Sequence, residues 1–290
     1  MPVSVVVPAH NEAAVIKRCL SSMIVDAPDD NFPEIVVVCN GCTDDTAALA
    51  KSVDQRIRVI NLTEGSKILA INTGVSEAEG RPVFVVDADV VVSWQALKAT
   101  ADALDNDGIE IGSPRLVADT TGCDRFVRSF YTVWALTPYA NNNMVGSGVF
   151  GLSETALQRV GRLPPVIADD GYVRMLFATN ERCNVGEANP ADPNLTFTIY
   201  PPRTVGDLIA IEARRRAGDA ELEQFEHLAA PQVANSAGSL FGLVGNGATL
   251  RDVVTYMAIK IAGRLLFRWN RLRGRAKIWT RDESSRTVSA

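Results

Sequence analysis

The chain has few of the residues on which metal, redox and disulfide-bonded proteins depend. Its 290 residues include two histidines and five cysteines, an odd number that lacks the spacing of a disulfide framework. Cys39 and Cys42 have no second pair and no histidine near them in sequence, so we interpret them as small buried thiols and not as a zinc site. Cysteines used in this way are typical of a reducing cytosol, and we expect a cytoplasmic protein.

Long apolar runs and the common nucleotide-binding fingerprints are also missing. No run of 18 uncharged apolar residues occurs and a strand begins at the first residues, so we expect neither a membrane-spanning helix nor a signal peptide. The first apolar strand is followed by Pro8-Ala-His10-Asn-Glu12 and not by Gly-x-Gly-x-x-Gly, and no P-loop motif is present. Nicotinamide-dependent redox chemistry and P-loop nucleotide hydrolysis are therefore disfavoured.

The composition is that of a globular protein whose charge is unevenly distributed. Hydrophobic residues make up 47% and charged residues 22% of the chain, which is ordinary for a folded domain. The net charge of −5 combines a net +7 over residues 251–290, from ten basic residues and three acids, with −12 over the remainder. The body is acidic and the C-terminal segment is basic. Nucleic acid is not expected among the partners.

Short apolar runs alternate with helical patterns in the first hundred residues. The runs that predict strands are Val3–Val7, Ile35–Cys39, Ile57–Leu62 and Pro82–Asp87. Helices are predicted from Val15 to Met23, after a cap at Thr43, and over Ser66–Ser76, with Asp44 and Asp45 in the first turn of the second helix. This alternation predicts an α/β fold with a doubly wound, mostly parallel sheet and right-handed crossovers.

Two carboxylates, Asp87 and Asp89, follow the fourth predicted strand. The carboxyl ends of strands in an open α/β sheet are where such folds bind ligands. Two hard oxygen ligands at this edge could hold Mg²⁺ or Mn²⁺ against a phosphorylated substrate. Asp-x-Asp is short and common, so on its own it is better explained as the exit of a strand into a polar loop, and the surrounding motifs decide.

Four further features mark the chain after residue 140. Asn141–Gly151, which contains Gly146, Ser147 and Gly148, is small and polar and suits close approach of the backbone to a ligand. Asp169 and Asp170 open a predicted helix, where acids are commonly caps. Arg214, Arg215 and Arg216 are consistent with a solvated helical face. The stretch 229–249 is rich in small residues and is interpreted as a linker or loop.

The basic C-terminal segment predicts an amphipathic helix from about Arg251 to Arg273. Its apolar residues share one arc, namely Val254, Ala258, Ile261, Leu265, Trp269 and Leu272. Its basic residues share the neighbouring arc, namely Lys260, Arg264, Arg268, Arg271 and Arg275. Two interpretations stay open: residues 251–277 bind an anionic membrane surface, or the apolar stripe docks on the acidic body.

Taken in order, these motifs resemble glycosyltransferase family 2, the inverting enzymes with the GT-A fold that use nucleotide sugars. The resemblance covers about residues 1–230. It is carried by seven segments, namely 6–12, 40–46, 65–74, 87–89, 146–148, 169–170 and 214–216. The family pattern implies a nucleotide-sugar-binding half at 1–107, an acceptor-binding and catalytic half of the same domain at 108–230, and a basic helical extension at 231–290.

The resemblance also implies a role for each motif. Asp89 would ligate Mg²⁺ or Mn²⁺, with Asp87 on the ribose or sharing the metal, and Asp170, or else Asp169, would be the catalytic base. Gly146, Ser147 and Gly148 would lie at the acceptor and donor sugar. Nucleotide-binding roles fall on Pro8, His10, Glu12, Asn40, Lys67, Arg215 and Arg216, with Arg214 an alternative by a slip of one residue.

Two departures from the family pattern affect specificity. Asn40 stands where many members carry an acid that recognises uracil, so uridine specificity is in doubt. The Gln-x-x-Arg-Trp element is represented at best by Glu212-Ala-Arg-Arg215-Arg216, without the Trp of processive members. Together with the expected absence of membrane-spanning helices, this departure favours transfer of one sugar.

The expected enzyme is a metal-dependent glycosyltransferase. The expected partners are a nucleoside-diphosphate sugar and a hydroxyl acceptor, either a glycan or lipid-linked, in envelope or extracellular polysaccharide or glycolipid synthesis. It would be cytoplasmic, with a peripheral position on the inner membrane face left open. The alternatives are a sugar-phosphate nucleotidyltransferase, whose usual Gly-rich loop after the first strand is absent, and a non-catalytic nucleotide-binding scaffold.

Overall fold

A computed structural model describes residues 3–189, 191–228 and 237–273, and in it the chain forms two units. The first unit takes in the chain up to Val117 together with Asn143–Pro165 and Leu176–Ile199. The second takes in Ala118–Asn142, Val166–Met175 and the chain from Tyr200 onward. These units reflect proximity in space. The functional division after residues 107 and 230, which rests on the order of the motifs, stays a prediction.

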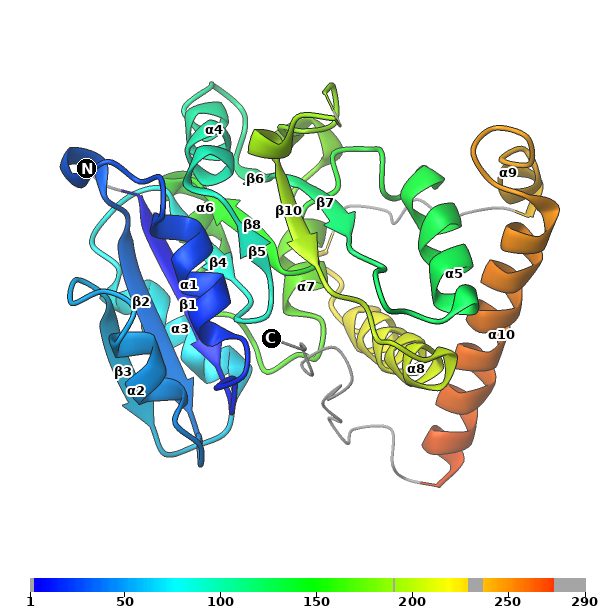
Figure 1. The fold of residues 1–290 in the computed structure, drawn as a ribbon, viewed down its shortest axis with the longest axis horizontal. Coiled ribbons are helices and arrows are strands. Elements are labelled where there is room, and N and C mark those ends of the chain that lie inside the picture. The colour runs from blue at the N-terminus through cyan, green and yellow to red at the C-terminus, as the bar shows by residue number, and fades with distance from the viewer. Residues whose placement is uncertain (1–2, 190, 229–236, 274–290) are drawn as a thin grey trace. The chain divides into compact units, whose positions relative to one another are not determined.

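Strands and helices alternate through the first unit (Figure 1). Its strands are β1 (Ser4–Ala9), β2 (Glu34–Asn40), β3 (Arg58–Leu62), β4 (Val83–Val86), β5 (Val91–Val92), β6 (Ile111–Ser113), β7 (Arg115–Ala118, whose last residue belongs to the second unit), β8 (Val149–Leu152), β9 (Arg182–Asn184) and β10 (Thr196–Ile199). Its helices are α1 (Ile16–Ile24), α2 (Thr46–Lys51), α3 (Lys67–Glu77), α4 (Trp94–Leu104) and α6 (Glu154–Val160), with 3₁₀ turns η1 (Asp29–Asn31), η2 (Thr179–Glu181) and η3 (Pro193–Leu195).

The larger sheet has the strand order β3-β2-β1-β4-β8-β6-β9. β1 pairs in parallel with β2 and β4, and β2 pairs in parallel with β3. β8 is antiparallel to both β4 and β6, whereas β6 and β9 are again parallel. A small sheet joins β5, β10 and β7. The predicted α/β fold with a mostly parallel sheet is therefore confirmed.

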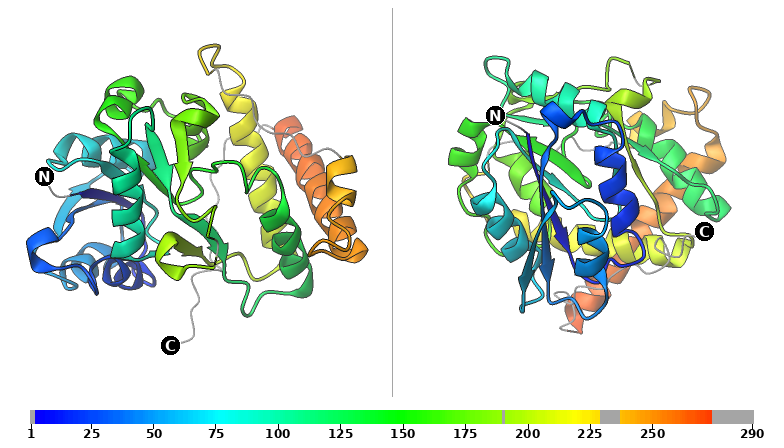
Figure 2. Two further views of the ribbon diagram at one scale, coloured as in Figure 1. Left: turned by 90° about the horizontal axis from the view of Figure 1, so that it is seen from above. Right: turned by 60° about the vertical axis from the view of Figure 1, so that its left-hand side comes forward.

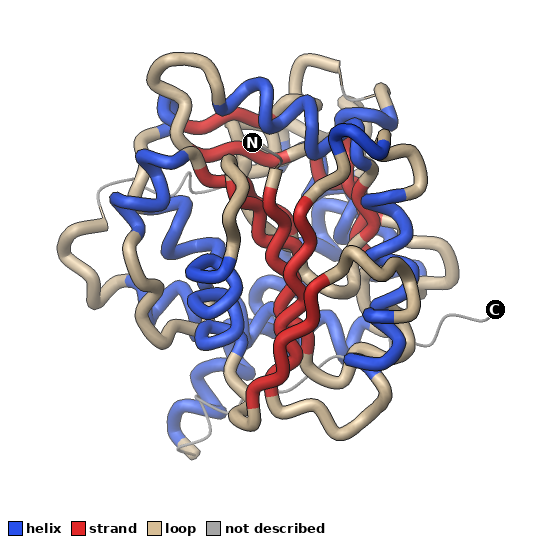
Figure 3. Tube along the Cα trace, turned by 90° about the vertical axis from the view of Figure 1, so that its left-hand side faces the viewer, coloured by secondary structure: helices blue, strands red, loops and turns tan. Residues whose placement is uncertain are grey.

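Apolar strands covered on both faces form the core of the first unit. Every residue of β1 and β4 is buried, as expected for valine-rich strands in a parallel sheet. Gly74 brings α3 against the sheet so closely that a Cβ there would lie 2.2 Å from Val6 Cγ1. α1 and α2 lie on the opposite face, and Figure 3 shows the strands running between helices on either side.

The predicted strands and the helices α1 and α3 are confirmed to within a residue or two, but the expected start of α2 is wrong. That helix begins at Thr46 and has no acid in its first turn, so Thr43 is not its cap. Asp44 and Asp45 lie before the helix. The Asp44 carboxylate instead accepts hydrogen bonds from the backbone N–H groups of Thr46 (3.1 Å) and Ala13 (3.2 Å). It connects the loops after β1 and β2, a contact that local sequence cannot indicate.

Helices make up the second unit. In chain order they are α5 (Arg125–Leu136), α7 (Asp169–Met175), α8 (Val205–Leu222), α9 (Ala237–Phe241) and α10 (Leu250–Leu272). Figures 1 and 2 show α5, α8 and α10 side by side. The rings of Phe130 on α5 and Tyr256 on α10 stack with centroids 4.8 Å apart. At Gly263 of α10 a Cβ would lie 2.7 Å from the Cβ of Glu212 on α8, so the missing side chain allows the two helices to approach.

Helix α10 packs through a face other than the predicted apolar stripe. The residues that it buries are Val253, Tyr256, Ile259 and Gly263. All six residues of the stripe are exposed, so the interpretation in which the stripe docks on the acidic body is wrong. Residues 274–277 of the predicted membrane segment and 229–236 of the predicted linker lie outside the described residues. Of the described helices, none is long and apolar enough to cross a membrane.

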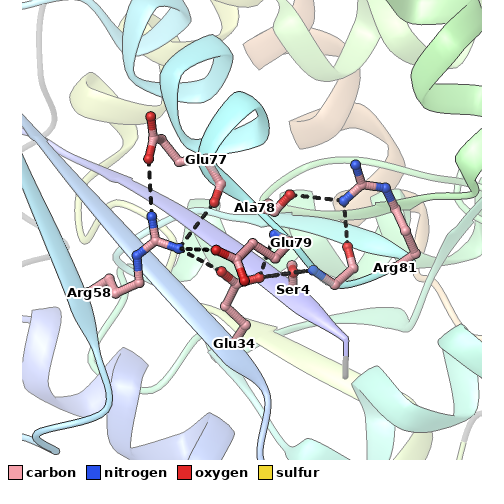
Figure 4. A network of polar contacts seen from close by, with 8 residues as sticks. Ser4, Glu34, Arg58, Glu77, Ala78, Glu79 and Arg81 are labelled. Carbon is pink, nitrogen blue, oxygen red and sulfur yellow. Dashed lines mark hydrogen bonds and ion pairs between the residues drawn. The ribbon is translucent and has the colours of Figure 1, made fainter. Parts of the chain in front are cut away.

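A polar network ties the amino ends of the first three strands to the loop before β4 (Figure 4). The Glu34 carboxylate of β2 accepts hydrogen bonds from the hydroxyl of Ser4 and from the backbone N–H groups of Glu79 (2.8 Å) and Gly80 (3.0 Å). It also forms an ion pair with Arg58 (2.9 Å). Partial burial on its own would raise the pKa of Glu34. The hydrogen-bond donors and the Arg58 cation together lower it by more, so the pKa of Glu34 lies below its ordinary value.

We predict that Glu34→Gln lowers the free energy of unfolding at pH 7 by about 1–3 kcal/mol, since charge-assisted hydrogen bonds are lost from a half-buried site. Because the folded-state pKa is depressed, the stabilisation is present above the unfolded-state pKa and is lost as the pH falls through the folded-state value. Urea denaturation at pH 7 and at about pH 3 measures both effects, and the deficit of the variant should shrink at the lower pH.

Glu79→Gln is the matched control. The Glu79 side chain is 88% exposed and its carboxylate lies 3.9 Å from the same Arg58, so its removal should change stability by less than about 0.5 kcal/mol. Equal losses in the two variants, or a Glu34→Gln deficit that is unchanged at low pH, would contradict the role given to this network.

Candidate functional site

The carboxyl ends of β1, β2 and β4 form one edge of the large sheet. There the His10 Nδ1 donates to the carbonyl of Asn40 (2.5 Å), and the Asn40 Nδ2 donates to the carbonyl of Ala9 (2.8 Å). Continuing the register that pairs Val6 with Val85 places Pro8 beside Asp87. The order of strands reverses between β1 and β4, which is the position where open α/β sheets bind their ligands.

The loops after β1 and β2 are fastened to each other at this edge. The Asn11 Oδ1 accepts from the backbone N–H of Thr43 (2.7 Å), and the buried Glu12 donates its own N–H to the hydroxyl of Thr46 (2.7 Å). Asn11 has a φ of 55°, a conformation that asparagine tolerates better than most residues. Sequence reasoning assigned no role to Asn11, although an asparagine directly after a buried strand could have indicated it.

Asp87 pairs with Lys67 where β4 ends. Asp87 follows β4 directly, and its Oδ1 lies 2.8 Å from Nζ of Lys67, the first residue of α3. Both side chains are partly exposed, at 32% and 40% respectively. Asp89 lies two residues further on in a turn, where its backbone carbonyl accepts a hydrogen bond from Arg18 of α1 (3.2 Å). The structure therefore brings the predicted acids to the predicted edge, with a cation beside them.

The segment Gly146-Ser147-Gly148 lies against Asp87. All three residues have a positive φ, at 113°, 59° and 119°, and the Gly148 carbonyl accepts from the backbone N–H of Asp87 (2.8 Å). A Cβ at Gly148 would lie 3.9 Å from the Asp87 Oδ2 and only 2.8 Å from Val90 Cγ1. Glycine adopts a positive φ without strain, so Ser147 is the strained residue here, and strained backbone is concentrated at functional sites. The predicted ligand-approach segment is thus next to the predicted metal ligands.

The donor chemistry at Asp87 and Asp89 fits a divalent ion of the Mg²⁺ or Mn²⁺ kind. Within the described residues no group of three His, Cys, Asp or Glu side chains forms a complete cage. Mg²⁺ normally keeps several waters and is held by one or two carboxylates together with substrate phosphates, so two aspartates at a strand end meet that need. Lys67 beside them supplies a further positive charge toward the same place.

In the second unit, Asp169 and Asp170 form the first turn of α7. Asp169 is 5% exposed, whereas Asp170 is half-buried and its Oδ1 accepts from the N–H of Gly171 (2.7 Å). Small residues fix this turn on α8. A Cβ at Gly171 would lie 2.9 Å from a methyl of Leu222, and a Cβ at Gly218 would lie 2.8 Å from that of Ala168.

Two side chains of α7 add to this position and were missed by sequence reasoning. Tyr172 shares a hydrogen bond of 3.1 Å with Nε2 of His227. Arg174, four residues after Asp170, is 8% exposed and its guanidinium lies 5.1 Å from the centroid of the Tyr139 ring. Burial alone would lower the pKa of Arg174, but Tyr139, Asp170 and Asp219 raise it, so the side chain stays a cation. The spacing of four residues between Asp170 and Arg174 on a predicted helix is the feature of the sequence that could have indicated this pair.

The three arginines of α8 differ in their surroundings. Arg215 Nη1 lies 2.8 Å from Oε1 of Glu212, a buried acid whose Oε2 lies 2.7 Å from Nζ of Lys260 on α10. Burial on its own would raise the pKa of Glu212, but Arg215 and Lys260 lower it below the ordinary value. Arg216 has a looser pairing, 3.8 Å from Asp219, and Arg214 is half-buried. Glu212 therefore joins α8 to α10 through Lys260 with Arg215 as its second partner, whereas Arg216 is held less tightly.

We predict that Gly148→Ala lowers the free energy of unfolding by more than the cost of placing alanine at a positive φ. The φ of 119° should cost about 1–3 kcal/mol, and the clash with Val90 should add about 1–3 kcal/mol. Urea denaturation gives the stability. The added methyl group also narrows the space beside Asp87.

Gly108→Ala separates strain from crowding, because Gly108 has a φ of 84° and a Cβ there would meet nothing within 4 Å. It should show only the cost of the backbone conformation. If the two variants lose equal stability, the close approach at Gly148 has no energetic consequence.

The chain is similar to known sugar-transferring proteins. It is 23% identical over 256 residues to Glycosyltransferase AglE of Haloferax volcanii, covering 84% of this chain and 80% of that protein. Its fold is similar to that of the Pyrobaculum calidifontis mannosyltransferase PcManGT, solved with GDP-Man and Mn²⁺ (TM-score 0.64, 20% identity, 92% of this chain and 87% of that one). It is also similar to glucosyl-3-phosphoglycerate synthase of Mycobacterium tuberculosis, solved with Mn²⁺, UDP-glucose and phosphoglyceric acid (TM-score 0.50, 19% identity, 76% and 79%).

These structural likenesses confirm the GT-A fold expected from the sequence motifs. Residues 4–156, more than half of the chain, match the sequence profile of glycosyl transferase family 2. That stretch contains the edge of the sheet at which His10, Asn40, Lys67, Asp87 and Asp89 gather. The chain therefore belongs to glycosyl transferase family 2 and is a nucleotide-sugar glycosyltransferase.

Proposed function

We propose that the protein moves one sugar from a nucleoside-diphosphate sugar to an acceptor hydroxyl, with inversion and with the help of Mg²⁺ or Mn²⁺. The observation that carries the proposal is the placement of Asp87, Asp89 and Lys67 at the carboxyl edge of the sheet, where the strand order reverses. Two carboxylates and an ammonium within one small region suit a metal–diphosphate pair better than they suit a neutral ligand.

The nucleoside is proposed to bind at the ends of β1 and β2, against Pro8, His10, Glu12 and Asn40. The hydrogen bond from His10 to the Asn40 carbonyl fixes the imidazole ring, which can then offer a flat face to a base. The Asn40 amide is oriented by the Ala9 carbonyl, which takes its Nδ2 donor. The Oδ1 is then the group that could accept from the N–H of a uracil or guanine edge.

The diphosphate is proposed to lie between Lys67 and the two aspartates. Asp89 and Asp87 would hold the divalent ion, which when bound offsets the negative charge that develops on the leaving diphosphate. Lys67 can contact a phosphate oxygen as a point charge. In the structure its ammonium group forms an ion pair with the Asp87 carboxylate. The glycine-rich segment Gly146–Gly148, whose Gly148 carbonyl accepts from the backbone N–H of Asp87, is proposed to contact the donor sugar there.

Asp170 is proposed as the base that removes the proton from the acceptor hydroxyl. It is more exposed than Asp169, which suits a group that has to reach a substrate. Arg174, as a buried cation near it, favours the ionised carboxylate that a base requires. Of the α8 arginines, Arg216 is proposed as the cation for the diphosphate, with Arg215 and Arg214 as alternatives, because Arg215 is already paired with the buried Glu212.

The acceptor is proposed to be a glycan or lipid-linked hydroxyl of envelope or extracellular polysaccharide or glycolipid synthesis. The site of transfer would be the cytoplasm or the inner face of the membrane. The support for this assignment is the exposed arginine-rich helix α10. Transfer of a single sugar is supported by Glu212-Ala-Arg-Arg215-Arg216, which lacks the tryptophan of processive members.

We predict that UDP or GDP binds more tightly with Mn²⁺ than without it, and that Asp89→Ala removes this difference. Loss of a metal ligand should weaken nucleotide binding in the presence of Mn²⁺ by about 1.4 kcal/mol or more, a tenfold change or greater. Isothermal calorimetry with each nucleotide, with and without Mn²⁺, measures the effect independently of turnover.

Asp105→Ala, which removes an exposed carboxylate at the end of α4, is the control and should bind nucleotide as the wild type does. Equal affinity with and without Mn²⁺, or an Asp89→Ala variant that still responds to the metal, would count against a metal site at this edge.

We predict that Asp170→Asn lowers transfer by about 10²–10⁴-fold while nucleotide affinity changes little, because the amide cannot accept the proton of the acceptor. Initial rates with a nucleotide sugar, together with calorimetry, separate turnover from binding. Asp169→Asn is the matched variant one residue away and should keep more activity. If transfer survives in Asp170→Asn and is lost in Asp169→Asn, the base has been assigned to the wrong aspartate.

A further inference from the structure

We propose that the exposed apolar face of α10 binds the surface of an anionic lipid bilayer, with the helix lying parallel to the membrane. The face consists of Val254, Ala258, Ile261, Leu265, Trp269 and Leu272, and we call it the α10 stripe. The contact depends on α10 alone and would hold whichever sugar the enzyme transfers. It differs from the sugar-transfer site in its residues and in its ligand.

The stripe is apolar and exposed along the whole helix. The exposed fractions are 53% for Val254, 51% for Ile261, 58% for Leu265, 53% for Trp269 and 85% for Leu272. At 1.5 Å per residue the stripe is about 27 Å long. Single exposed apolar residues are ordinary, whereas a continuous row of this length on one helix is typical of an interaction surface.

The opposite face of α10 is already occupied. Val253, Tyr256, Ile259 and Gly263 are buried, and α10 contacts both α5 and α8. Lys260 is paired with the buried Glu212 of α8. The two faces therefore have different roles, because one anchors the helix to its own unit and the other remains outside. The helix can use the stripe without leaving its place in the fold.

The charge beside the stripe indicates which partner fits. Exposed arginines border it on both sides, namely Arg251, Arg264, Arg268, Arg271 and Arg273, and the only acid of α10 is Asp252 in its first turn. The Arg273 guanidinium lies 4.2 Å from the centroid of the exposed Trp269 ring. A helix with an apolar face, basic borders and a tryptophan has the chemistry of helices that lie in the headgroup region of anionic membranes.

A second copy of the chain fits the stripe less well. In a two-fold symmetric contact through α10, the arginines that border one stripe would face those of the other, and like charges at an interface oppose association. An anionic bilayer instead presents negative charge to all of these arginines at once. The apolar residues between them can enter the boundary of the acyl chains.

The test is co-sedimentation of the full-length protein with vesicles, either phosphatidylcholine alone or phosphatidylcholine mixed with phosphatidylglycerol. The wild type should bind the mixed vesicles and not those of phosphatidylcholine alone, and more weakly as salt is added. Arg264→Gln with Arg268→Gln should weaken binding roughly 30-fold, as two charges near an anionic surface predict. Ile261→Ser with Leu265→Ser should weaken it about tenfold or more, by loss of inserted apolar surface.

Matched controls lie outside α10. Val25→Ser removes an apolar side chain that is 73% exposed, and Arg125→Gln with Arg162→Gln removes two exposed arginines. Each control should bind within about twofold of the wild type. Point variants are preferred to deletion of residues 251–290, because deletion would uncover the faces of α5 and α8 against which α10 packs. Equal thermal midpoints for all variants establish that the fold is intact.

Several results would overturn the proposal. These are equal binding to both kinds of vesicle, no binding to either, or stripe variants that bind as the controls do. A wild-type dimer that becomes a monomer in Ile261→Ser with Leu265→Ser, measured by light scattering, would assign the stripe to a second copy. Vesicle binding needs neither donor nor acceptor, so a failure here is distinguishable from a failure of the sugar-transfer proposal.

Discussion

The parallel pairing of β1 with β2 on one side and β4 on the other is the constraint on which the rest of the first unit depends. Because the three strands run the same way in register, their carboxyl ends reach the same edge. His10, Asn40 and Asp87 are then neighbours although they are far apart in sequence. Helix α3 returns across the sheet from β3 to β4 and begins with Lys67, which brings the lysine to Asp87. The backbone topology therefore places the candidate donor-binding groups before any ligand is present.

The sequence predicted this part of the site because its signals are local. Each strand contains a short apolar run rich in valine, and a polar group follows near the end of the run, as Asp87 does after Val86. Parallel α/β folds leave few other arrangements for such a pattern. The positions of Asp87, Asp89, His10 and Asn40 at one edge follow from these local rules, without knowledge of any contact.

Other features were out of reach because they depend on contacts between distant segments. β8 pairs antiparallel with β4, Val86 opposite Val149, and only this pairing shows that the glycine-rich segment before β8 lies against Asp87. The start of α2 depends on Asp44 reaching Ala13 in another loop. Hydrophobic periodicity identified α10 and its apolar arc but not the face that packs. The contact of α10 with α8 depends on Gly263, which has no side chain to keep the helices apart. It also depends on Lys260, which pairs with Glu212 of α8.

Burial and charge in the second unit give the two adjacent acids of α7 different surroundings. A base has to be ionised and also accessible, and burial opposes both requirements. Asp169 is almost fully buried, whereas Asp170 keeps part of its surface in solvent. Arg174 is itself a costly group to bury, yet Tyr139, Asp170 and Asp219 hold it as a cation. A cation beside Asp170 favours the carboxylate form that the proposed base needs. Partial exposure and a neighbouring cation therefore distinguish Asp170 from Asp169 as the proposed base.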